Sequence, residues 1–426
     1  MTPRQLAHTL LLKAEKAGQY SNIALDHALE ASDLSLADKR LASILFYGVT
    51  ERKLTLDHRI ASLSSRPLSE LDASVLCALR LGIYQLSYLD RIPAHAAINE
   101  TVELCTRRTA GFVNAILRAH TRTPESYPNR EDIAYYLSIK YSVCLELAEK
   151  LISSFGEDEA ERILEGFNTT PDTTLRTNTL RISREELAKN IEGATYSEIS
   201  PAGLHVKGSV RELYGYSDGL FFVQDEASQI CVEALDAREG DTLIDVCSCP
   251  GSKSFGSAIK MNNKGRILAF DLHENKLSLI KSGAERLGID IIETRAADGR
   301  IEIPELIGSA DRVLCDVPCS GFGVISKKPE LRYKNPKESE RLPEIQRAIL
   351  ENACKYVKRG GLLVYSTCTL LPEENELRVL DFLSRHPEFE LVPFTVGKVE
   401  AKDGYITLYP HIHKTDGFFV SKLIRK

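Results

Sequence analysis

The feature that most limits the possible folds is an alternation of apolar and helical segments that begins at Ala227 and continues to the end of the chain. The apolar segments have the length and aliphatic character of buried strands. They lie at residues 242–247, 266–271, 290–295, 312–315 and 361–369. Strands that alternate with helices form parallel, doubly wound sheets. We therefore expect an α/β domain over residues 221–426.

The first part of the chain has a different pattern. Residues 1–125 carry apolar side chains three and four positions apart, which predicts an all-α bundle. Its arginines, Arg80 and Arg107 among them, are expected on the solvated surface, where arginine is common. Residues 126–220 begin at a proline-containing linker and mix helical with β-branched segments, so we expect a small α+β adaptor there.

Composition excludes several classes of protein. No run of eighteen or more apolar residues occurs, so we expect no membrane-spanning helix, and the first residues lack the apolar core of a signal peptide. Ten cysteines are scattered through 426 residues, which favours a reducing cytoplasm over a disulfide framework. The net charge of −6 means that any nucleic-acid site must be a local basic patch.

Two cysteines follow predicted strands and point to chemistry. Asp316 ends one strand, Pro318 makes a turn and Cys319 follows it, whereas Cys368 follows the next strand. Ligands bind outside the carboxyl ends of parallel strands, and neighbouring strands would bring both thiols to one edge. Neither cysteine has the neighbours that a metal site requires, so we expect no metal and favour covalent catalysis. The alternative is that they are ordinary buried cysteines.

Carboxylates at successive strand ends predict a nucleoside site. The loop after the first strand is tight and opens a helix, which allows backbone N–H groups to approach a ligand. Asp271 ends the second strand and Asp298 follows the third. The GxGxxG pattern of dinucleotide sites is absent, and several acids suit a neutral or cationic ligand. S-adenosylmethionine has that character. The alternative is that aspartate is simply common where loops begin.

The same segments resemble a known family, the RNA 5-methylcytosine methyltransferases. The likeness rests on Asp316-Val-Pro-Cys-Ser-Gly, Tyr365-Ser-Thr-Cys-Thr-Leu, Glu373-Glu-Asn-Glu and the loop Cys247-Ser-Cys-Pro-Gly-Ser-Lys. Residues 1–125 resemble the NusB-like RNA-binding domain, through segments such as His95-Ala-Ala-Ile-Asn-Glu and Phe112-Val-Asn-Ala-Ile-Leu-Arg. The combination is similar to bacterial enzymes that act on 16S rRNA.

This resemblance implies a Rossmann-like, class I methyltransferase domain that uses S-adenosylmethionine. It implies that Cys368 is the nucleophile that attacks C6 of cytosine and that Cys319 helps to release the product. Asp316 would contact the cytosine or the cofactor, and Lys253 would lie beside it. The implied cofactor-binding residues are Cys247, Ser248, Cys249, Pro250, Gly251, Ser252, Lys253, Asp271, Asp298 and Asp316.

The implied activity is methylation of 16S rRNA at cytosine C5, of the cytosine 967 type, by a cytoplasmic monomer. RNA phosphates would be contacted by a local basic patch, made of Lys327, Lys328, Arg332, Lys334, Lys337 and Arg341. Two alternatives remain. The chain could methylate another rRNA or a tRNA site, or it could be a non-catalytic RNA-binding assembly factor. The second rests on Ser252, which stands where the family has a second glycine.

Overall fold

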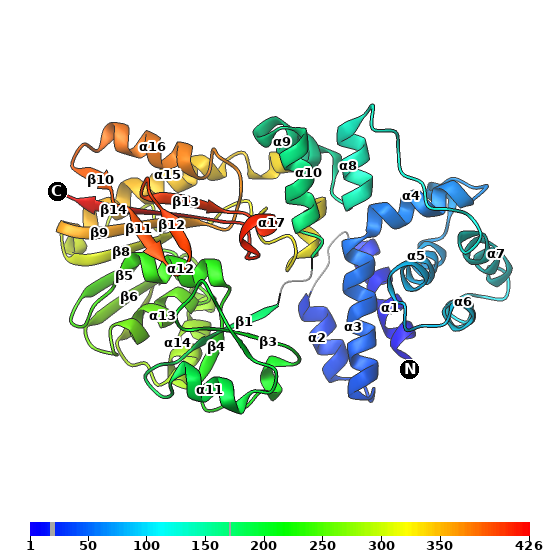
Figure 1. Cartoon of the computed structure of the whole chain (residues 1–426), viewed down its shortest axis with the longest axis horizontal. Coiled ribbons are helices and arrows are strands. Elements are labelled where there is room, and N and C mark those ends of the chain that lie inside the picture. The colour runs from blue at the N-terminus through cyan, green and yellow to red at the C-terminus, as the bar shows by residue number, and fades with distance from the viewer. Residues whose placement is uncertain (18–21, 170–171) are drawn as a thin grey trace. The chain divides into compact units, whose positions relative to one another are not determined.

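The computed structural model describes residues 1–17, 22–169 and 172–426 (Figure 1). Two compact units are distinguished. The first comprises Met1–Glu165 with Lys327–Asn335, and the second comprises Gly166–Ser326 with Pro336–Lys426. Each unit is described separately below.

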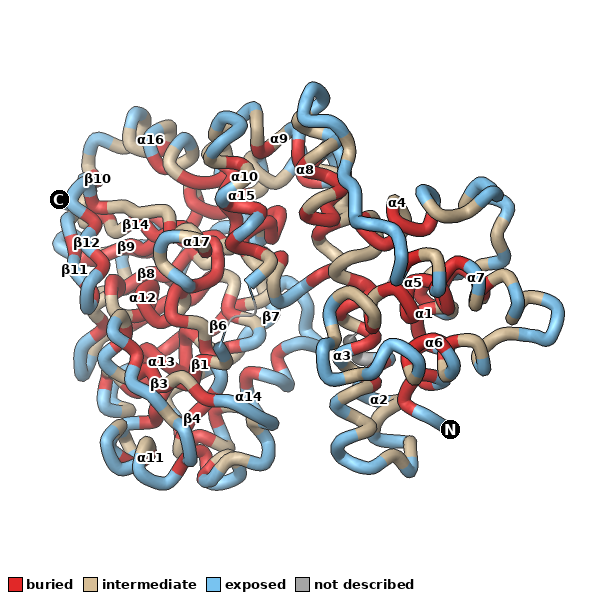
Figure 2. The backbone as a smooth tube through the Cα atoms, turned by 45° about the vertical axis from the view of Figure 1, so that its right-hand side comes forward, coloured by how far each residue is buried: buried red, intermediate tan, exposed pale blue. Residues whose placement is uncertain are grey.

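The first unit is helical, which confirms the all-α prediction for the N-terminal part. Its core is formed by apolar residues such as Leu45, Ile60, Leu79 and Leu117, each with no exposed surface. Helix α5 is the centre of this core and is buried along most of its length (Figure 2). The helices are α1 Pro3–Ala17, α2 Asn22–Glu30, α3 Leu36–Glu51, α4 Lys53–Leu63, α5 Ala73–Tyr88, α6 Ala94–Val102, α7 Ala110–His120, α8 Ile133–Tyr141, α9 Leu145–Phe155 and α10 Glu157–Gly166.

A segment from late in the sequence completes this unit. Residues Lys327–Asn335 pack among its helices, where Arg332 is 1% exposed and donates from Nη1 to the carbonyl oxygen of Tyr141 at 2.9 Å. The Tyr333 hydroxyl lies 2.5 Å from the carbonyl oxygen of Thr50 and 3.0 Å from Ser142 Oγ. Burial lowers the pKa of Arg332 to about 10. The expectation that Arg332 contacts RNA phosphates is therefore wrong, because its guanidinium is enclosed by protein.

Arg80 also departs from the expectation of a solvated arginine. Its side chain is 3% exposed and forms a bidentate pair with Asp57, at 2.6 and 2.8 Å, while Nη1 donates to Glu15 at 2.9 Å. Arginine is suited to such sites because its planar fork matches a carboxylate. Helical periodicity places Arg80 on α5 but does not reveal that two carboxylates from other helices meet it.

The second unit begins with a small antiparallel sheet, in agreement with the predicted α+β segment. Its strand order is β2-β3-β1-β4. Leu175, Leu204 and Phe221 form its buried core against the side chain of Leu187 on the helix that crosses it. The elements are β1 Thr173–Thr177, α11 Arg184–Asn190, β2 Thr195–Tyr196, β3 Gly203–Val206 and β4 Phe221–Val223.

A larger sheet forms the rest of the second unit, with the order β10-β14-β9-β8-β5-β6-β7 and with β13 paired to β14. The pairs β5–β6, β5–β8, β6–β7 and β8–β9 are parallel, as expected. Pairs that involve β14 are antiparallel, so the sheet is mixed, and the expectation of parallel strands to the end of the chain does not hold there. Its strands are β5 Thr242–Asp245, β6 Arg266–Asp271, β7 Ile292–Ala296, β8 Ala310–Asp316, β9 Val357–Thr367, β10 Phe389–Leu391, β13 Tyr405–Leu408 and β14 Phe418–Arg425.

Helices cover both faces of this sheet, so successive residues of its central strands enter different cores. Leu243 and Leu314 belong to one cluster with residues of α12–α14, whereas Ile244 and Val313 belong to another with residues of α15 and α16. This alternation follows from the two-residue period of a strand. The remaining elements are α12 Glu226–Leu235, α13 Ser252–Lys260, α14 Leu277–Leu287, α15 Leu342–Ala353, α16 Glu376–Arg385, β11 Phe394–Val396, β12 Val399–Ala401 and α17 Pro410–His413. Within the stretches that the structure describes, no helix combines the length and apolar character needed to cross a bilayer.

The buried ion pairs of Arg80 give a stability prediction. Arg80→Ala should lower the free energy of unfolding of the first unit by about 2–3 kcal/mol, because Asp57 loses its bidentate partner and Glu15 keeps only Lys53, at 3.2 Å. The cost stays below that of a fully buried pair, since the side chains of Asp57 and Glu15 are 17% and 25% exposed. Amide hydrogen exchange of α5 in the full chain measures this opening energy. Arg107→Ala, at an exposed position, is the control and should change it by less than about 0.5 kcal/mol. Equal exchange in both variants would contradict the assignment.

Candidate active site

The predicted site residues gather where the strand order of the large sheet reverses. From β5 the chain proceeds outward to β6 and β7, and then returns to place β8 on the other side of β5. Ligands of open α/β sheets bind at such a switch point, outside the carboxyl ends of the strands. The loop after β5 and the start of α13 carry Cys247–Lys253, and the turn after β8 carries Cys319.

The two predicted thiols lie side by side. Strands β8 and β9 pair in parallel with Asp316 opposite Ser366, so the turns that follow them leave the sheet together. The sulfur atoms of Cys319 and Cys368 are 3.1 Å apart, and the Cys368 N–H donates to the sulfur of Cys319 at 3.3 Å. This hydrogen bonding with Cys368, together with burial, holds the pKa of the Cys319 thiol well above its usual range. Both side chains remain partly accessible.

Lys253 and Asp316 form an ion pair at the carboxyl end of β8, within electrostatic range of Cys368. Lys253 Nζ lies 2.5 Å from Asp316 Oδ2, and Ser366 Oγ donates to the other carboxylate oxygen at 2.7 Å. Burial would lower the pKa of Lys253, but the Asp316 carboxylate outweighs it and raises that pKa above its usual range. Lys253 is therefore a fixed cation, and the carboxylate of Asp316 is oriented by two donors.

The loop after β5 requires glycine at one position. Gly251 has φ +107°, and a Cβ there would lie 2.5 Å from the ring of Phe255, so both backbone and space exclude a side chain. Ser252 is the first residue of α13, and its carbonyl oxygen accepts from Gln224 Nε2 at 3.1 Å. The helical backbone at residue 252 tolerates a side chain. Substitution of a family glycine by Ser252 therefore does not strain the loop.

Two serines hold the loop to β5. Ser248 Oγ lies 2.9 Å from Ser254 Oγ, which in turn donates to Asp245 Oδ2 at 2.6 Å. Burial raises the pKa of Asp245 to about 6. We did not predict this role for Asp245 and Ser254. The sequence signal was the presence of three serines, at positions 248, 252 and 254, directly after a strand that ends in Asp245.

Four strand-end acids lie within electrostatic range of Cys247. Burial raises the pKa of this thiol, and the carboxylates of Asp245, Asp316, Asp271 and Asp298 raise it further. All four carboxylates therefore raise the pKa of the same thiol. A site of this kind fits a nucleoside that carries an ammonium and a sulfonium, because a cation offsets the repulsion among the carboxylates. The residues present therefore fit S-adenosylmethionine.

The other predicted cofactor residues lie around this point. Asp271 ends β6, is half-buried and accepts the N–H of His273 at 3.0 Å. Both carboxylate oxygens of Asp298 are bound by Arg300, which lowers the pKa of that carboxyl. Cys249 directs its thiol towards the carbonyl oxygen of Lys276 at 3.7 Å, and Pro250 is exposed.

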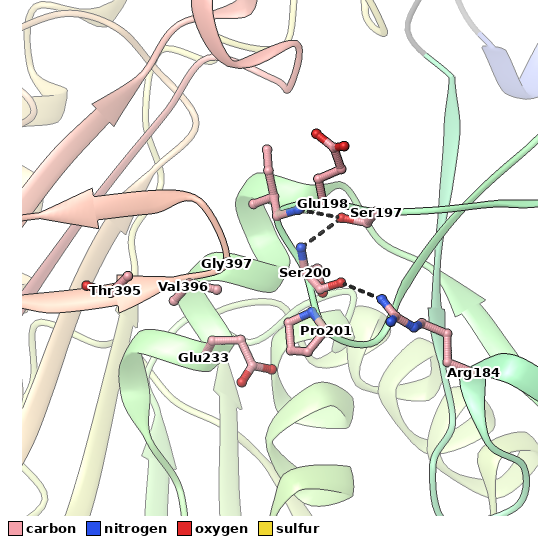
Figure 3. A pocket seen from close by; sticks show the side chains of 10 residues that line it. Arg184, Ser197, Glu198, Ser200, Pro201, Glu233, Thr395, Val396 and Gly397 are labelled. Carbon is pink, nitrogen blue, oxygen red and sulfur yellow. Dashed lines mark hydrogen bonds between the residues drawn. The ribbon is translucent and has the colours of Figure 1, made fainter.

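A cavity of about 400 Å³ lies elsewhere in the second unit (Figure 3). It is formed by α11, the loop before β3, α12 and the β11–β12 hairpin, and none of the predicted site residues lines it. Arg184 donates to the carbonyl oxygen of Ser200 at 3.3 Å at its margin. For the described part of the chain, no group of three or more His, Cys, Asp or Glu side chains is arranged to hold a metal ion.

Three protein families match successive parts of the chain. Residues 1–122 match the NusB family, residues 147–211 match a ferredoxin-like domain of RsmF/B-like methyltransferases, and residues 232–424 match the family described as 16S rRNA methyltransferase RsmB/F.

Similar proteins cover nearly the whole chain. A probable ribosomal RNA small subunit methyltransferase B of Bacillus subtilis is 36% identical over 99% of this chain and 98% of its own length. The crystal structure of PH0851 superposes with a TM-score of 0.79 at 28% identity, covering 100% of this chain and 99% of that one. NSun6 from Pyrococcus horikoshii, solved with the S-adenosylmethionine analogue SFG, gives a TM-score of 0.59 at 26% identity over 66% of this chain and 97% of that one.

The raised pKa of Asp245 predicts a pH-dependent stability. Between about pH 4 and 6 the unfolded chain releases the Asp245 proton while the folded chain keeps it, so rising pH favours unfolding. Relative to Asp245→Asn, the wild type should lose about 2–3 kcal/mol over this range and no more above it. Thermal unfolding of both proteins from pH 4 to 8 measures the difference. A difference that stays constant from pH 4 to 6 would refute the prediction.

Proposed function

Because the chain belongs to the 16S rRNA methyltransferase RsmB/F family and is an S-adenosylmethionine-dependent RNA methyltransferase, we propose that it methylates C5 of a cytosine in 16S rRNA. The proposed position is cytosine 967, and the proposed route is a covalent bond between a cysteine sulfur and C6 of the base.

The observation that carries this proposal is the pair of thiols at the ends of adjacent strands. The sulfur atoms of Cys319 and Cys368 are 3.1 Å apart and lie beside the Lys253–Asp316 ion pair. One thiol suffices to form a covalent intermediate, so a second one at this distance suggests a role in its breakdown.

A covalent bond between the enzyme and the base makes C5 of cytosine reactive. C5 of cytosine is a poor nucleophile, but attack of a thiolate on C6 turns the ring into an enamine whose C5 accepts a methyl group. We assign this thiolate to Cys368, as the family resemblance implies. After methylation the C5 proton leaves, the double bond re-forms and Cys368 is expelled. We assign assistance in this release to Cys319.

Asp316 and Lys253 would orient the reactants. Asp316 lies at the carboxyl end of β8 and is held by two donors, so its carboxylate can accept from the cytosine amine or the cofactor ammonium. Lys253 fixes that carboxylate, because its Nζ lies 2.5 Å from Oδ2. Removal of Lys253 would leave a charged group unpaired at the site, which is costly.

The cofactor would be held by the loop after β5 and by the strand-end acids. S-adenosylmethionine supplies the activated methyl group when it is bound. Asp271 is placed where α/β sheets hold a ribose. The backbone around Gly251 admits close approach, and the collected carboxylates suit the positive charges of the ligand.

RNA binding would use the N-terminal domain and the basic patch that follows Cys319. We propose that residues 1–125 bind RNA, that residues 126–220 act as an adaptor and that residues 221–426 are catalytic, in the cytoplasm. Of the predicted basic patch, Lys327, Lys328, Lys337 and Arg341 are exposed and can reach phosphates. The target base must leave its stack to react, which is least costly in a single-stranded loop.

Substitution of each cysteine separates the proposed roles. With labelled S-adenosylmethionine and unmodified 16S rRNA, Cys368→Ala should lose at least about a thousandfold in rate, because the nucleophile is gone. Cys319→Ala should accumulate a protein–RNA adduct that survives denaturing electrophoresis.

The control is Cys105→Ala, at a cysteine of the first unit, which should leave both readouts unchanged. An adduct that forms in Cys368→Ala but not in Cys319→Ala would reverse the two roles. Absence of both cofactor binding and methyl transfer in the wild type would favour the non-catalytic assembly factor.

The target is tested by mapping. We expect 5-methylcytosine at position 967 of 16S rRNA after reaction of purified enzyme with naked rRNA, read by bisulfite sequencing. Modification of another rRNA position, or of tRNA in a parallel reaction, would support the alternative substrate and contradict the proposed position.

A further inference from the structure

Two consecutive residues, Glu374 and Asn375, bind the turns that carry the two thiols. Both follow Cys368 by a few positions and precede α16. Their side chains have 1% and 0% exposed surface. Buried polar side chains destabilise the fold unless they form hydrogen bonds. The hydrogen-bond partners of these two residues therefore indicate their structural role.

Asn375 holds the Cys368 turn on both sides. Its Oδ1 accepts from Thr367 Oγ1 at 2.5 Å, and its Nδ2 donates to the carbonyl oxygen of Thr369 at 3.0 Å. Residues 367 and 369 flank Cys368 directly. The amide of Asn375 therefore fixes the backbone that presents the proposed nucleophile.

Glu374 holds the Cys319 turn. Its Oε2 accepts the N–H of Ser320 at 2.9 Å, and it also accepts Gln346 Nε2 at 2.7 Å. The same Gln346 nitrogen lies 3.0 Å from the carbonyl oxygen of Pro318. The residues before and after Cys319 are thus tied, directly or through Gln346, to one carboxylate.

The charge of Glu374 is not balanced by a neighbouring cation. Among the described residues, no lysine or arginine forms an ion pair with it. The groups that bind its side-chain oxygens are donors, which favours the ionised form. Burial nevertheless raises the pKa of Glu374, and its charge is one of the causes that raise the pKa of Cys319.

We propose that Glu374 is a positioning residue that holds the Cys319 turn and helps to keep Cys319 protonated beside Cys368, while Asn375 fixes Cys368 for attack. This inference rests on the proposed function. A negative charge next to Cys319 disfavours a second negative charge on its sulfur. Of the two adjacent thiols, Cys319 is then the one that stays protonated, so its S–H can donate to the sulfur of Cys368.

This arrangement gives Cys319 a defined part in product release. As the C6–Sγ bond of the adduct breaks, its electron pair stays on the sulfur of Cys368. The C5 proton leaves to water, and the electrons of the C5–H bond form the C5=C6 double bond. The S–H of Cys319, 3.1 Å away, stabilises the departing thiolate by a hydrogen bond.

The test measures the protonation of Cys319 directly. In a Cys368→Ala background, the rate of alkylation of Cys319 by iodoacetamide is followed from about pH 7 to 11 by peptide mass spectrometry. Glu374→Gln keeps the shape and the acceptor for Ser320 but removes the charge. It should shift the alkylation midpoint of Cys319 to lower pH by about one unit. A midpoint unchanged from the Cys368→Ala parent would overturn the proposal.

The neighbouring Glu373→Gln is the matched control, because it removes the same charge one residue away. It should shift the midpoint by less than half as much, and an equal shift would mean that general charge rather than Glu374 sets the protonation. Glu374→Asp retains the charge on a shorter side chain, and its midpoint should stay closer to the parent. If Glu374→Gln does not fold, a Glu374→Asp midpoint that falls by one unit overturns the proposal.

With Cys368 present, Glu374→Gln should prolong the life of the protein–RNA adduct, relative to the wild type, as the pH approaches the lowered alkylation midpoint of Cys319, because a Cys319 thiolate cannot donate to the leaving sulfur. An adduct lifetime equal to that of the wild type at this pH would overturn the proposed part in release. The alkylation assay uses no RNA and no cofactor. It therefore judges Glu374 even if the wild type transfers no methyl group, which would be a failure of the proposed function alone.

Discussion

The parallel pairing of β8 with β9 is the constraint on which the site depends. Asp316 stands opposite Ser366 in this ladder, and every later contact follows from that register. The Ser366 hydroxyl reaches the Asp316 carboxylate, and the two turns that leave the sheet bring Cys319 and Cys368 to 3.1 Å. A shift of one residue would turn each of these side chains to the opposite face. The hydrophobic cores on both faces of the sheet therefore fix the strand register, and with it the positions of the two thiols.

Negative charge exceeds positive charge around the loop that follows β5. Four carboxylates act on Cys247, and Lys253 is the buried cation that pairs with one of them. Burial of the Asp245 carboxyl is the main cause that raises its pKa to about 6, and the negative charge of Asp316 raises it further. A protein that only needed stability would gain by replacing such groups with apolar ones. Their presence together is consistent with a cationic ligand that the site is built to accept.

The segment between the Cys319 turn and α15 is partly buried in the first unit, which its basic composition does not predict. It is rich in lysine and arginine, as RNA-binding loops are, yet Arg332 and Tyr333 are anchors inside the first unit rather than contacts for phosphate. The chain that follows a proposed catalytic residue is thus fastened among the helices of the N-terminal unit. The exposed lysines of this segment, Lys327, Lys328 and Lys337, are the ones proposed to contact RNA.

The sequence by itself determined the helical N-terminal part, the α/β domain and the meeting of Cys319 with Cys368, because periodicity and strand order follow from local patterns. It did not reveal that Arg80 and Arg332 are buried, since a long charged side chain enters a core only where distant partners happen to meet it. Nor did it reveal the contacts of Ser254, Glu374 and Asn375. Their partners lie on other strands and turns, so only tertiary packing decided which polar groups face each other and which thiol lies next to a buried carboxyl group.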